Sequence, residues 1–384
     1  MLRAFRVELK PNNVQRSLLF QAAGTARWAY NWGLAQSRAH RLDTGSFLWD
    51  GPLRQQLTQL KKTAEFAWLR QYSNNIPKQA LRDMSTALKN WSQHRAEEPA
   101  FKSRRKTVPS FYHDPGKLKV FGDHVQLEKI GRIRLKEHHY IPVGVSYLNP
   151  RISCLNGRWY LSVAVETGEI ATQEVPFSEP IGIDLGIKTL AVVSDGQVFK
   201  NINKTRKIQR LEKKRRRLQR RASRLYPKPQ KRNEVKIRWK KSRNLAQLEK
   251  QISAVSKRIK DQHINHIHQM THALVKTKPE YIVIEDLNVS GMLKNRHLAK
   301  AIQDNRLREV RRQLEYKSQR YGISLIVADR FFPSSKLCSA CGHKKSDLKL
   351  SDRVYRCTAC GQTMDRDLNA AINLKHYPRQ STSE

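Results

Sequence analysis

Apolar and polar residues alternate over the first ten positions, which predicts a strand with Phe5, Val7 and Leu9 on one face. The spacing of apolar residues then changes to three and four over residues 13–40, as in an amphipathic helix. Asn12 or Asn13 is a suitable cap for the start of this helix. Its inward positions are expected to be Leu18, Leu19, Ala22, Ala26, Ala29 and Tyr30.

Two further helices are predicted near residues 52–62 and 77–95, the second with Pro77 in its first turn. A basic, turn-rich linker follows at residues 101–111. Tryptophan is frequent in this helical block. Most of these side chains are expected in a hydrophobic core, with base stacking as the alternative: Trp28, Trp32, Trp49, Trp68 and Trp91.

Between about residues 108 and 170 the apolar period becomes two, which predicts strands. Residues 151–166 read as a hairpin that turns at Asn156 and Gly157. A small β-barrel or a curled sheet, completed by the N-terminal strand, is the simplest arrangement. The helical block is then an insertion into this sheet.

A new pattern begins near Pro180, with apolar strands predicted within residues 181–199 and 281–287. Between them, apolar residues three and four apart predict two helices that pair as a coiled-coil hairpin, with Pro227 and Pro229 in the connection. The seam positions are Ile208, Leu211, Leu218, Leu245, Leu248, Ile252, Val255 and Ile259.

Charge narrows the choice of partner. The chain of 384 residues has 74 Lys and Arg against 33 Asp and Glu, a formal net charge of +41. Such an excess favours a polyanion as partner, so nucleic acid is expected, and the basic helix at residues 207–224 is expected to contact phosphate. No run of about eighteen apolar residues suggests a membrane span. The absence of an export signal, with reduced cysteines, points to the cytoplasm.

Four cysteines near the C-terminus form two Cys-x2-Cys pairs, separated by fifteen residues. This spacing is typical of a tetrahedral zinc ribbon, with disulfide pairing as the weaker alternative. The fifth cysteine, Cys154, falls in a predicted strand. We therefore expect one structural Zn²⁺, held by Cys338, Cys341, Cys357 and Cys360.

Three acidic residues lie at informative places in the predicted elements. Asp184 falls inside an apolar strand, Glu285 ends another, and Asp367 begins a short helix whose Ala370, Ala371 and Leu374 would pack inward. Each has an ordinary alternative: Asp184 could cap a turn, Glu285 could pair with a lysine, and Asp367 could cap its helix. Together, they could converge at one sheet edge and hold two Mg²⁺ ions for phosphodiester hydrolysis.

Two neighbouring acids compete for these roles. Asp365 is the alternative to Asp367, which is preferred for its place at the helix start. Asp286 is disfavoured because its side chain should point to the opposite face of the strand from Glu285.

Several blocks of this sequence resemble the signature blocks of TnpB, the OrfB-type protein of bacterial insertion sequences, a family regarded as ancestral to the type V CRISPR effectors. They are ARWAYNWGLAQ, IGIDLGIKTLAVVSDG, YIVIEDLNVSGM, RFFPSSKLCSACGH and CTACGQTMDRDLNAAINL, and they span nearly the whole chain. The resemblance implies that Asp184, Glu285 and Asp367 are the catalytic carboxylates of a RuvC-like site. It also implies that the four cysteines bind zinc in a ribbon inserted before the last catalytic block.

The resemblance also implies a multidomain α/β architecture, in which an RNase H-like (RuvC) nuclease domain carries the ribbon and an N-terminal β-barrel (wedge) carries a helical recognition insertion. The expected boundaries are 1–10 and 108–178 for the wedge, 11–107 for the recognition domain, 179–333 and 362–375 for the nuclease, 334–361 for the ribbon and 376–384 for a tail.

By the same resemblance, the expected activity is RNA-guided, Mg²⁺-dependent cleavage of DNA beside a short transposon-adjacent motif. The expected partners are a guide RNA from the transposon end and double-stranded target DNA, with no membrane and a monomer favoured, in the bacterial cytoplasm. The alternative is a catalytically silent, RNA-guided DNA-binding regulator or a transposition accessory protein. Retention of all three carboxylates argues against it.

Overall fold

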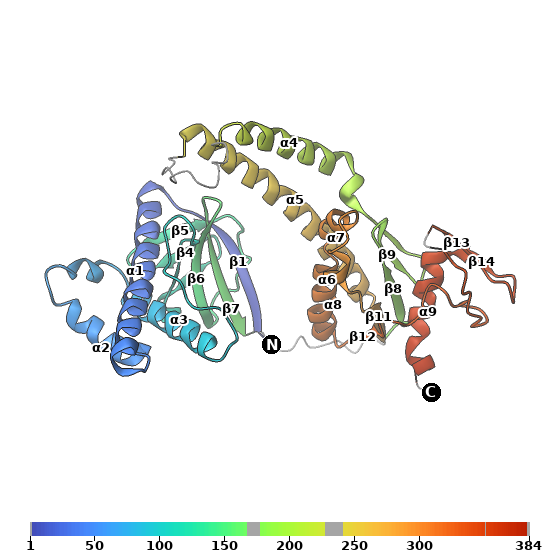
Figure 1. Cartoon of the computed structure of the whole chain (residues 1–384), viewed down its shortest axis with the longest axis horizontal. Helices are drawn as coiled ribbons and strands as arrows, with labels where there is room; N and C mark the ends of the chain where they lie inside the picture. Colours follow the sequence, from blue (N-terminus) through green and yellow to red (C-terminus); the bar gives the residue numbers. More distant parts are fainter. Residues whose placement is uncertain (1, 167–176, 227–240, 350, 382–384) are drawn as a thin grey trace. The chain divides into compact units, whose positions relative to one another are not determined.

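The computed structural model describes residues 2–166, 177–226, 241–349 and 351–381, with side chains described up to Tyr377. The chain divides into two compact units, Met1–Gly168 and Glu169–Glu384 (Figure 1). Among the described residues, no helix has both the length and the apolar character that crossing a membrane requires. The finer division into wedge, recognition, nuclease and ribbon segments stays a prediction.

The first unit contains one seven-stranded antiparallel sheet in the order β2-β6-β7-β1-β5-β4-β3. The strands are β1 Leu2–Lys10, β2 Ser110–Tyr112, β3 Lys119–Phe121, β4 His124–Leu127, β5 Gly131–Leu135, β6 Tyr147–Leu155 and β7 Arg158–Glu166. The predicted hairpin turn is confirmed, because Asn156 and Gly157 both adopt positive φ, 55° and 75°. The N-terminal strand lies in the middle of the sheet. Closure of the sheet into a barrel stays a prediction.

The helices of this unit lie between β1 and β2 in sequence, as expected for an insertion. They are α1 Asn13–Thr44, α2 Asp50–Leu60 and α3 Asn75–Ser92, with a short 3-10 turn at Ala67–Gln71. Another 3-10 turn, Pro115–Lys117, lies between β2 and β3. Asn12 caps α1, forming a reciprocal capping box with Gln15. The helix runs four residues beyond the predicted end because the left-handed residue that stops it is Gly45.

Helices and sheet of the first unit share one hydrophobic core. The expected core role of the tryptophans is confirmed for most of them, since Trp28, Trp32, Trp68 and Trp91 pack against this core. Trp49 is the exception, with 42% of its surface exposed.

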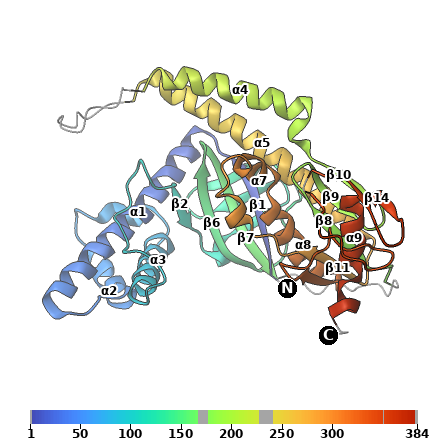
Figure 2. The ribbon, with the colours of Figure 1, turned by 45° about the vertical axis from the view of Figure 1, so that its right-hand side comes forward.

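The second unit is built on a five-stranded sheet in the order β10-β9-β8-β11-β12. Figure 2 shows β8, β9, β10 and β11 of this sheet. The strands are β8 Ile181–Leu185, β9 Thr189–Val193, β10 Val198–Lys200, β11 Tyr281–Glu285 and β12 Ser324–Ala328. β8, β11 and β12 are parallel, whereas β9 and β10 run antiparallel to their neighbours. β8 and β11 therefore end side by side at one edge of the sheet.

Helices cover both faces of this sheet. The helices of this unit are α4 Arg206–Ser223, α5 Arg243–Lys276, α6 Val289–Met292, α7 Ala299–Asn305, α8 Leu307–Tyr321 and α9 Arg366–Ser381, with a 3-10 turn at Ile202–Lys204. Residues of α5 and α8 pack against Ile183, Ile282 and Ile284 on one face. On the other face, Val283 packs with Leu374 of α9.

Close contact between α9 and β8 depends on Gly182. A Cβ atom at this position would overlap the backbone of Ala371 and Lys375 in α9. The absence of a side chain therefore lets the helix lie directly on the strand that carries Asp184.

The predicted helical hairpin is confirmed. Leu218 and Ala222 of α4 pack with Leu245, Leu248, Val255 and Ile259 of α5, and Leu211 and Ile252 lie against them. Pro227 and Pro229, expected in the connection, fall outside the described residues.

Candidate active site and metal centre

Asp184 and Glu285 lie on adjacent parallel strands. β8 and β11 pair with Ile183 opposite Ile284, and this register continued by one residue brings Asp184 beside Glu285. Side chains alternate along a strand, so both carboxylates share the face of Gly182 and Val283, which α9 covers. The two acids, about a hundred positions apart in the chain, thus meet at the carboxyl edge of the sheet.

Asp367 is in the first turn of α9, the helix that covers this face. It is not the cap of that helix. The Asp365 carboxylate accepts the backbone N–H groups of Asp367 and Leu368 at 2.9 and 3.1 Å, which is the geometry of an N-cap. Asp365 is thus engaged with the helix backbone, and the carboxylate of Asp367 is not used to cap the helix.

Arginine compensates part of the charge on Asp367. The guanidinium of Arg366 donates to its Oδ1 at 3.0 Å, and Arg353 lies 3.7 Å from its Oδ2. Asp286 is paired elsewhere, with Arg311 at 2.8 Å and with Arg330. Its side chain thus belongs to a surface ion-pair group, separate from the three acids.

The carboxylates affect one another electrostatically. Burial raises the pKa of Asp184 well above its usual value, and the negative charges of Glu285 and Asp367 raise it further. The pKa of Glu285 is also raised, by burial and by Asp367, although a hydrogen bond from Ser334 opposes the shift. Within the described part of the chain, Asp184 has no hydrogen bond or ion pair from another side chain. A buried carboxylate of this kind favours the binding of a cation or a proton.

The three acids are near one another without being closely packed. Among the described residues, only the cysteine group brings three or more ligand atoms within 4.8 Å of one another. The carboxylates fit divalent ions chemically, as hard oxygen donors whose charge is only partly compensated.

A cavity of about 190 Å³ adjoins Glu285 on the side of α8. Its wall combines apolar side chains, including Leu185 and Leu287, with Arg308, Arg311 and Arg330. Arginines beside a carboxylate site suit an anionic substrate such as a phosphodiester.

The four cysteines come together as predicted from their spacing. They are free thiols, with Sγ distances of 3.6 Å from Cys338 to Cys360 and from Cys341 to Cys357. A tetrahedron with Zn–S bonds of about 2.3 Å has sulfur atoms about 3.8 Å apart, so this group fits one zinc ion. The short strands β13 Val354–Arg356 and β14 Thr363–Asp365 pair beside the group, and Tyr355 is fully buried against it.

The backbone of the ribbon also favours thiolates. Hydrogen bonding to backbone groups at Cys360 and Ala359 lowers the pKa of Cys357 to about 6. A backbone hydrogen bond at His343 would lower the pKa of Cys341, but its neighbouring thiols and burial outweigh it and raise this pKa to about 12. Binding of a zinc ion would favour the thiolate form of such cysteines.

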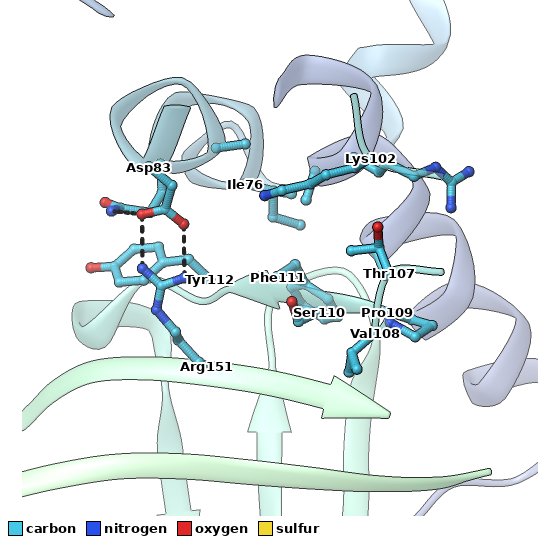
Figure 3. Close-up of a pocket in the computed structure, with 15 residues that line it drawn as sticks. Ile76, Asp83, Lys102, Thr107, Val108, Pro109, Ser110, Phe111, Tyr112 and Arg151 are labelled. Atoms are coloured by element: carbon cyan, nitrogen blue, oxygen red, sulfur yellow. Dashed lines mark hydrogen bonds and ion pairs between the residues drawn. The ribbon is translucent and has the colours of Figure 1, made fainter. Parts of the chain in front are cut away.

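The first unit has its own cavity, of about 50 Å³, between α1, α3 and β2. Figure 3 shows Asp83 of α3 joined to Arg151 of β6 by two parallel contacts, of 2.8 and 2.9 Å. Burial would raise the pKa of Asp83, but the hydrogen bonds from Arg151 and Gln79 outweigh it and lower the pKa. This carboxylate is thus committed to a structural ion pair, unlike Asp184.

Sequence reasoning missed Ser334, whose hydroxyl donates to Glu285 Oε1 at 2.5 Å. It also missed Asn369 and Asn373, which are buried in α9. Two asparagines four residues apart in a helix of inward-facing alanines were a usable signal. Nothing local distinguishes Ser334 from Ser335.

The basic composition, the buried acids at a sheet edge and the group of four thiols suit a protein that binds nucleic acid and metal ions. Family models match the chain in three places: "Helix-turn-helix domain" at 1–41, "Probable transposase" at 161–296 and "Cas12f1-like, TNB domain" at 308–374. In this structure, residues 2–41 form β1 and the single helix α1 instead of a helix-turn-helix.

Full-length relatives place the chain more narrowly. A "Putative RNA-guided DNA endonuclease" of Streptomyces pristinaespiralis is 32% identical over 97% of this chain and 88% of its own length. The "Putative RNA-guided DNA endonuclease InsQ" of Escherichia coli (strain K12) is 30% identical over 97% and 91%. The chain belongs to the TnpB (OrfB-type) family.

A solved structure shares the fold. The Cas12f1 protein in a cryo-EM structure of its complex with sgRNA and target DNA is 15% identical, with a TM-score of 0.58. The match covers 95% of this chain and 83% of that one. At this identity, the likeness supports a common multidomain α/β architecture.

Proposed function

We propose that this protein is an RNA-guided DNA endonuclease whose active site consists of Asp184, Glu285 and Asp367. The observation that carries the proposal is the convergence of these acids from β8, β11 and α9 on one face at the carboxyl edge of one sheet. Membership of a family whose relatives are named for RNA-guided DNA cleavage supports the substrate class. The five-stranded mixed sheet supports the RNase H-like (RuvC) assignment of the second unit.

The three acids would hold two Mg²⁺ ions. When bound, such ions activate the attacking water and stabilise the leaving 3′ oxygen of a phosphodiester. The protein's own contribution is to hold the carboxylates against their mutual repulsion, so that the site is ready for a dication. Arg308, at the adjoining cavity, would orient the anionic strand.

Guide RNA and target DNA would be held by backbone charge, leaving sequence choice to base pairing. A second cavity, of about 450 Å³, lies along α4 and supports this assignment. It is lined by Lys213, Arg216, Arg217, Arg220 and Lys300. Although Lys300 is paired with Asp304, the lining of this cavity keeps an excess of cations, which makes binding steeply salt-dependent. The four cysteines would hold one structural Zn²⁺.

We also propose the segment boundaries expected from the sequence: wedge, recognition insertion, nuclease, ribbon and tail. The sheet of the first unit would be the wedge, and its inserted helices the recognition segment.

The deciding experiment compares Asp184→Ala with Asp195→Ala. Asp195 lies in the turn after β9, where its carboxylate accepts the N–H of Gln197. With co-purified RNA and Mg²⁺, Asp184→Ala should cut a matching target at least about a thousandfold more slowly, while target binding is kept. Asp195→Ala should cut normally. Wild-type protein that binds its target without cutting would support the silent regulator instead.

A further inference from the structure

Two buried asparagines on α9 join the ribbon to the nuclease sheet. Asn369 and Asn373 are 0% and 2% exposed, and they lie one turn apart on α9, whose first turn contains the proposed catalytic Asp367. An amide buried in a helix is costly unless it is hydrogen-bonded. Both side chains are bonded to one short segment, Ser334–Ser339, which leads into the first cysteine pair. We call these two residues and this segment the asparagine clamp.

The hydrogen bonds of the clamp are short and directional. Asn369 Nδ2 donates to the carbonyl of Leu337 at 2.6 Å, and its Oδ1 accepts the N–H of Ser339 at 3.0 Å. Asn373 Nδ2 donates to the carbonyls of Leu337 and Ser334 at 2.8 and 2.7 Å. The position of the backbone at residues 334–339 is therefore fixed relative to α9.

One end of the clamp touches the cysteine group. Ser339 lies between Cys338 and Cys341, and the N–H of Cys338 donates to the carbonyl of His343 at 2.9 Å. Displacing Cys338 and Cys341 would thus disturb the backbone N–H of Ser339, which donates to Asn369.

The other end touches the active site. Ser334 is 4% exposed, and its hydroxyl donates to Glu285 Oε1 at 2.5 Å, while Asn373 holds its carbonyl. Because Asn373 fixes the backbone of Ser334, the Ser334 hydroxyl restricts the position of the Glu285 carboxylate, as an outer-shell partner does for a metal ligand.

We propose that Ser334 is a positioning residue for Glu285, and that the asparagine clamp makes the position of Ser334 depend on an intact ribbon. This inference rests on the proposed function, since it treats Glu285 as a divalent-metal ligand. The ribbon then acts on the active site from within the fold, in addition to any contact it makes with nucleic acid.

The first test compares Ser334→Ala with Ser335→Ala in the full protein–RNA complex. Ser335 is the adjacent serine, less buried, and its hydroxyl has no hydrogen bond within the described residues. Removing the positioning hydroxyl should raise the half-saturating Mg²⁺ concentration for cleavage about tenfold, with a smaller change in the rate at saturation. Ser335→Ala should match wild type. Identical Mg²⁺ curves for both variants would overturn the inference.

A second readout does not depend on cleavage. Mg²⁺ should raise the unfolding temperature of the complex, and Ser334→Ala should need about tenfold more Mg²⁺ for the same rise. Asp184→Ala provides the baseline for Mg²⁺ bound by RNA alone. If Ser334→Ala follows wild type here, Ser334 does not position a metal ligand.

The third test addresses the clamp. Asn369→Ala should raise the Mg²⁺ requirement as Ser334→Ala does, and should speed hydrogen exchange at Ser339, while the measured zinc content stays at one per chain. Because Asn369 acts on Glu285 through Ser334, the double variant Asn369→Ala and Ser334→Ala should need no more Mg²⁺ than Ser334→Ala alone. If the two substitutions instead multiply the Mg²⁺ requirement, the asparagine clamp does not act through Ser334, and the inference is overturned. Wild-type protein that fails to cut would instead remove the proposed function itself.

Discussion

The second unit contains two groups of side chains suited to metals, and the chain builds them in opposite ways. The four cysteines lie within 23 consecutive positions, and their sulfur atoms are within 4.8 Å of one another. The three carboxylates come from β8, β11 and α9, and burial together with their mutual charges raises the pKa of Asp184 and Glu285. The cysteine group joins residues that are close in sequence, and a zinc ion bound there would stabilise this short segment. The carboxylate group is held together by the rest of the fold, against its own repulsion.

This difference predicts that the same kind of damage has different consequences at the two sites. Loss of a carboxylate should remove chemistry and leave the fold intact, or even more stable. Loss of a cysteine should remove local structure first and chemistry as a result.

The largest effect is expected at the start of α9, where two aspartates lie two residues apart. Asp367→Asn should lower single-turnover cleavage at least about a thousandfold, because the amide is a poor divalent ligand. Asp365→Asn should stay within about tenfold of wild type, because asparagine caps a helix as well as aspartate does. Equal losses in the two variants would show that Asp365 shares the role of Asp367.

The next largest effect is expected in the ribbon. Cys357→Ser should lower the zinc content measured by atomic spectroscopy and reduce cleavage about a hundredfold, because the segment loses its metal clip. Cys154→Ser, in β6 of the first unit, is the control and should keep its zinc. Full cleavage by a zinc-free Cys357→Ser protein would mean that the ribbon is dispensable for the active site.

Packing of α9 on the sheet should be sensitive to a single methyl group. Gly182→Ala places a Cβ against the backbone of Ala371 and Lys375, and should destabilise the second unit by about 2–3 kcal/mol in denaturant unfolding. Gly24→Ala, inside α1 with no atom within 4 Å of the added Cβ, should be neutral or stabilising. A neutral Gly182→Ala would mean that α9 does not need this close approach.

The smallest effect is expected for Asp184→Asn in metal-free protein, and its sign is informative. The pKa of Asp184 is raised on folding, so the folded state binds the proton more tightly than the unfolded state. Stability is therefore lost as pH rises from the ordinary value of 3.8 through the raised pKa. Removing the charge should raise the unfolding temperature by a few degrees at pH 7, roughly 1 kcal/mol, and by less near pH 4. A lower unfolding temperature at pH 7 would contradict the claim that the charge of Asp184 destabilises the metal-free fold.

Local signals predicted much of this structure. The Asn156–Gly157 turn, the α4–α5 seam and the cysteine group each depend on residues close in sequence, and all three are present. Convergence of Asp184 and Glu285 could be inferred only by treating separate strands as neighbours, and the register of β8 with β11 places them side by side. The partners of these acids were beyond prediction. Arg353 and Ser334 reach the site from the ribbon and from the segment after β12, and only the folded chain brings them there.

The central position of β1 has a consequence for synthesis. Residues 2–10 are synthesised long before their partner strands, because they pair with β5 and β7, and β7 ends at Glu166. At about 5–20 residues per second, this strand stays unpaired for on the order of ten seconds or more. Its apolar face of Phe5, Val7 and Leu9 is exposed for that time. The nascent chain should therefore depend on a holding chaperone, or on slow initiation, more than a protein whose first strand pairs with its second.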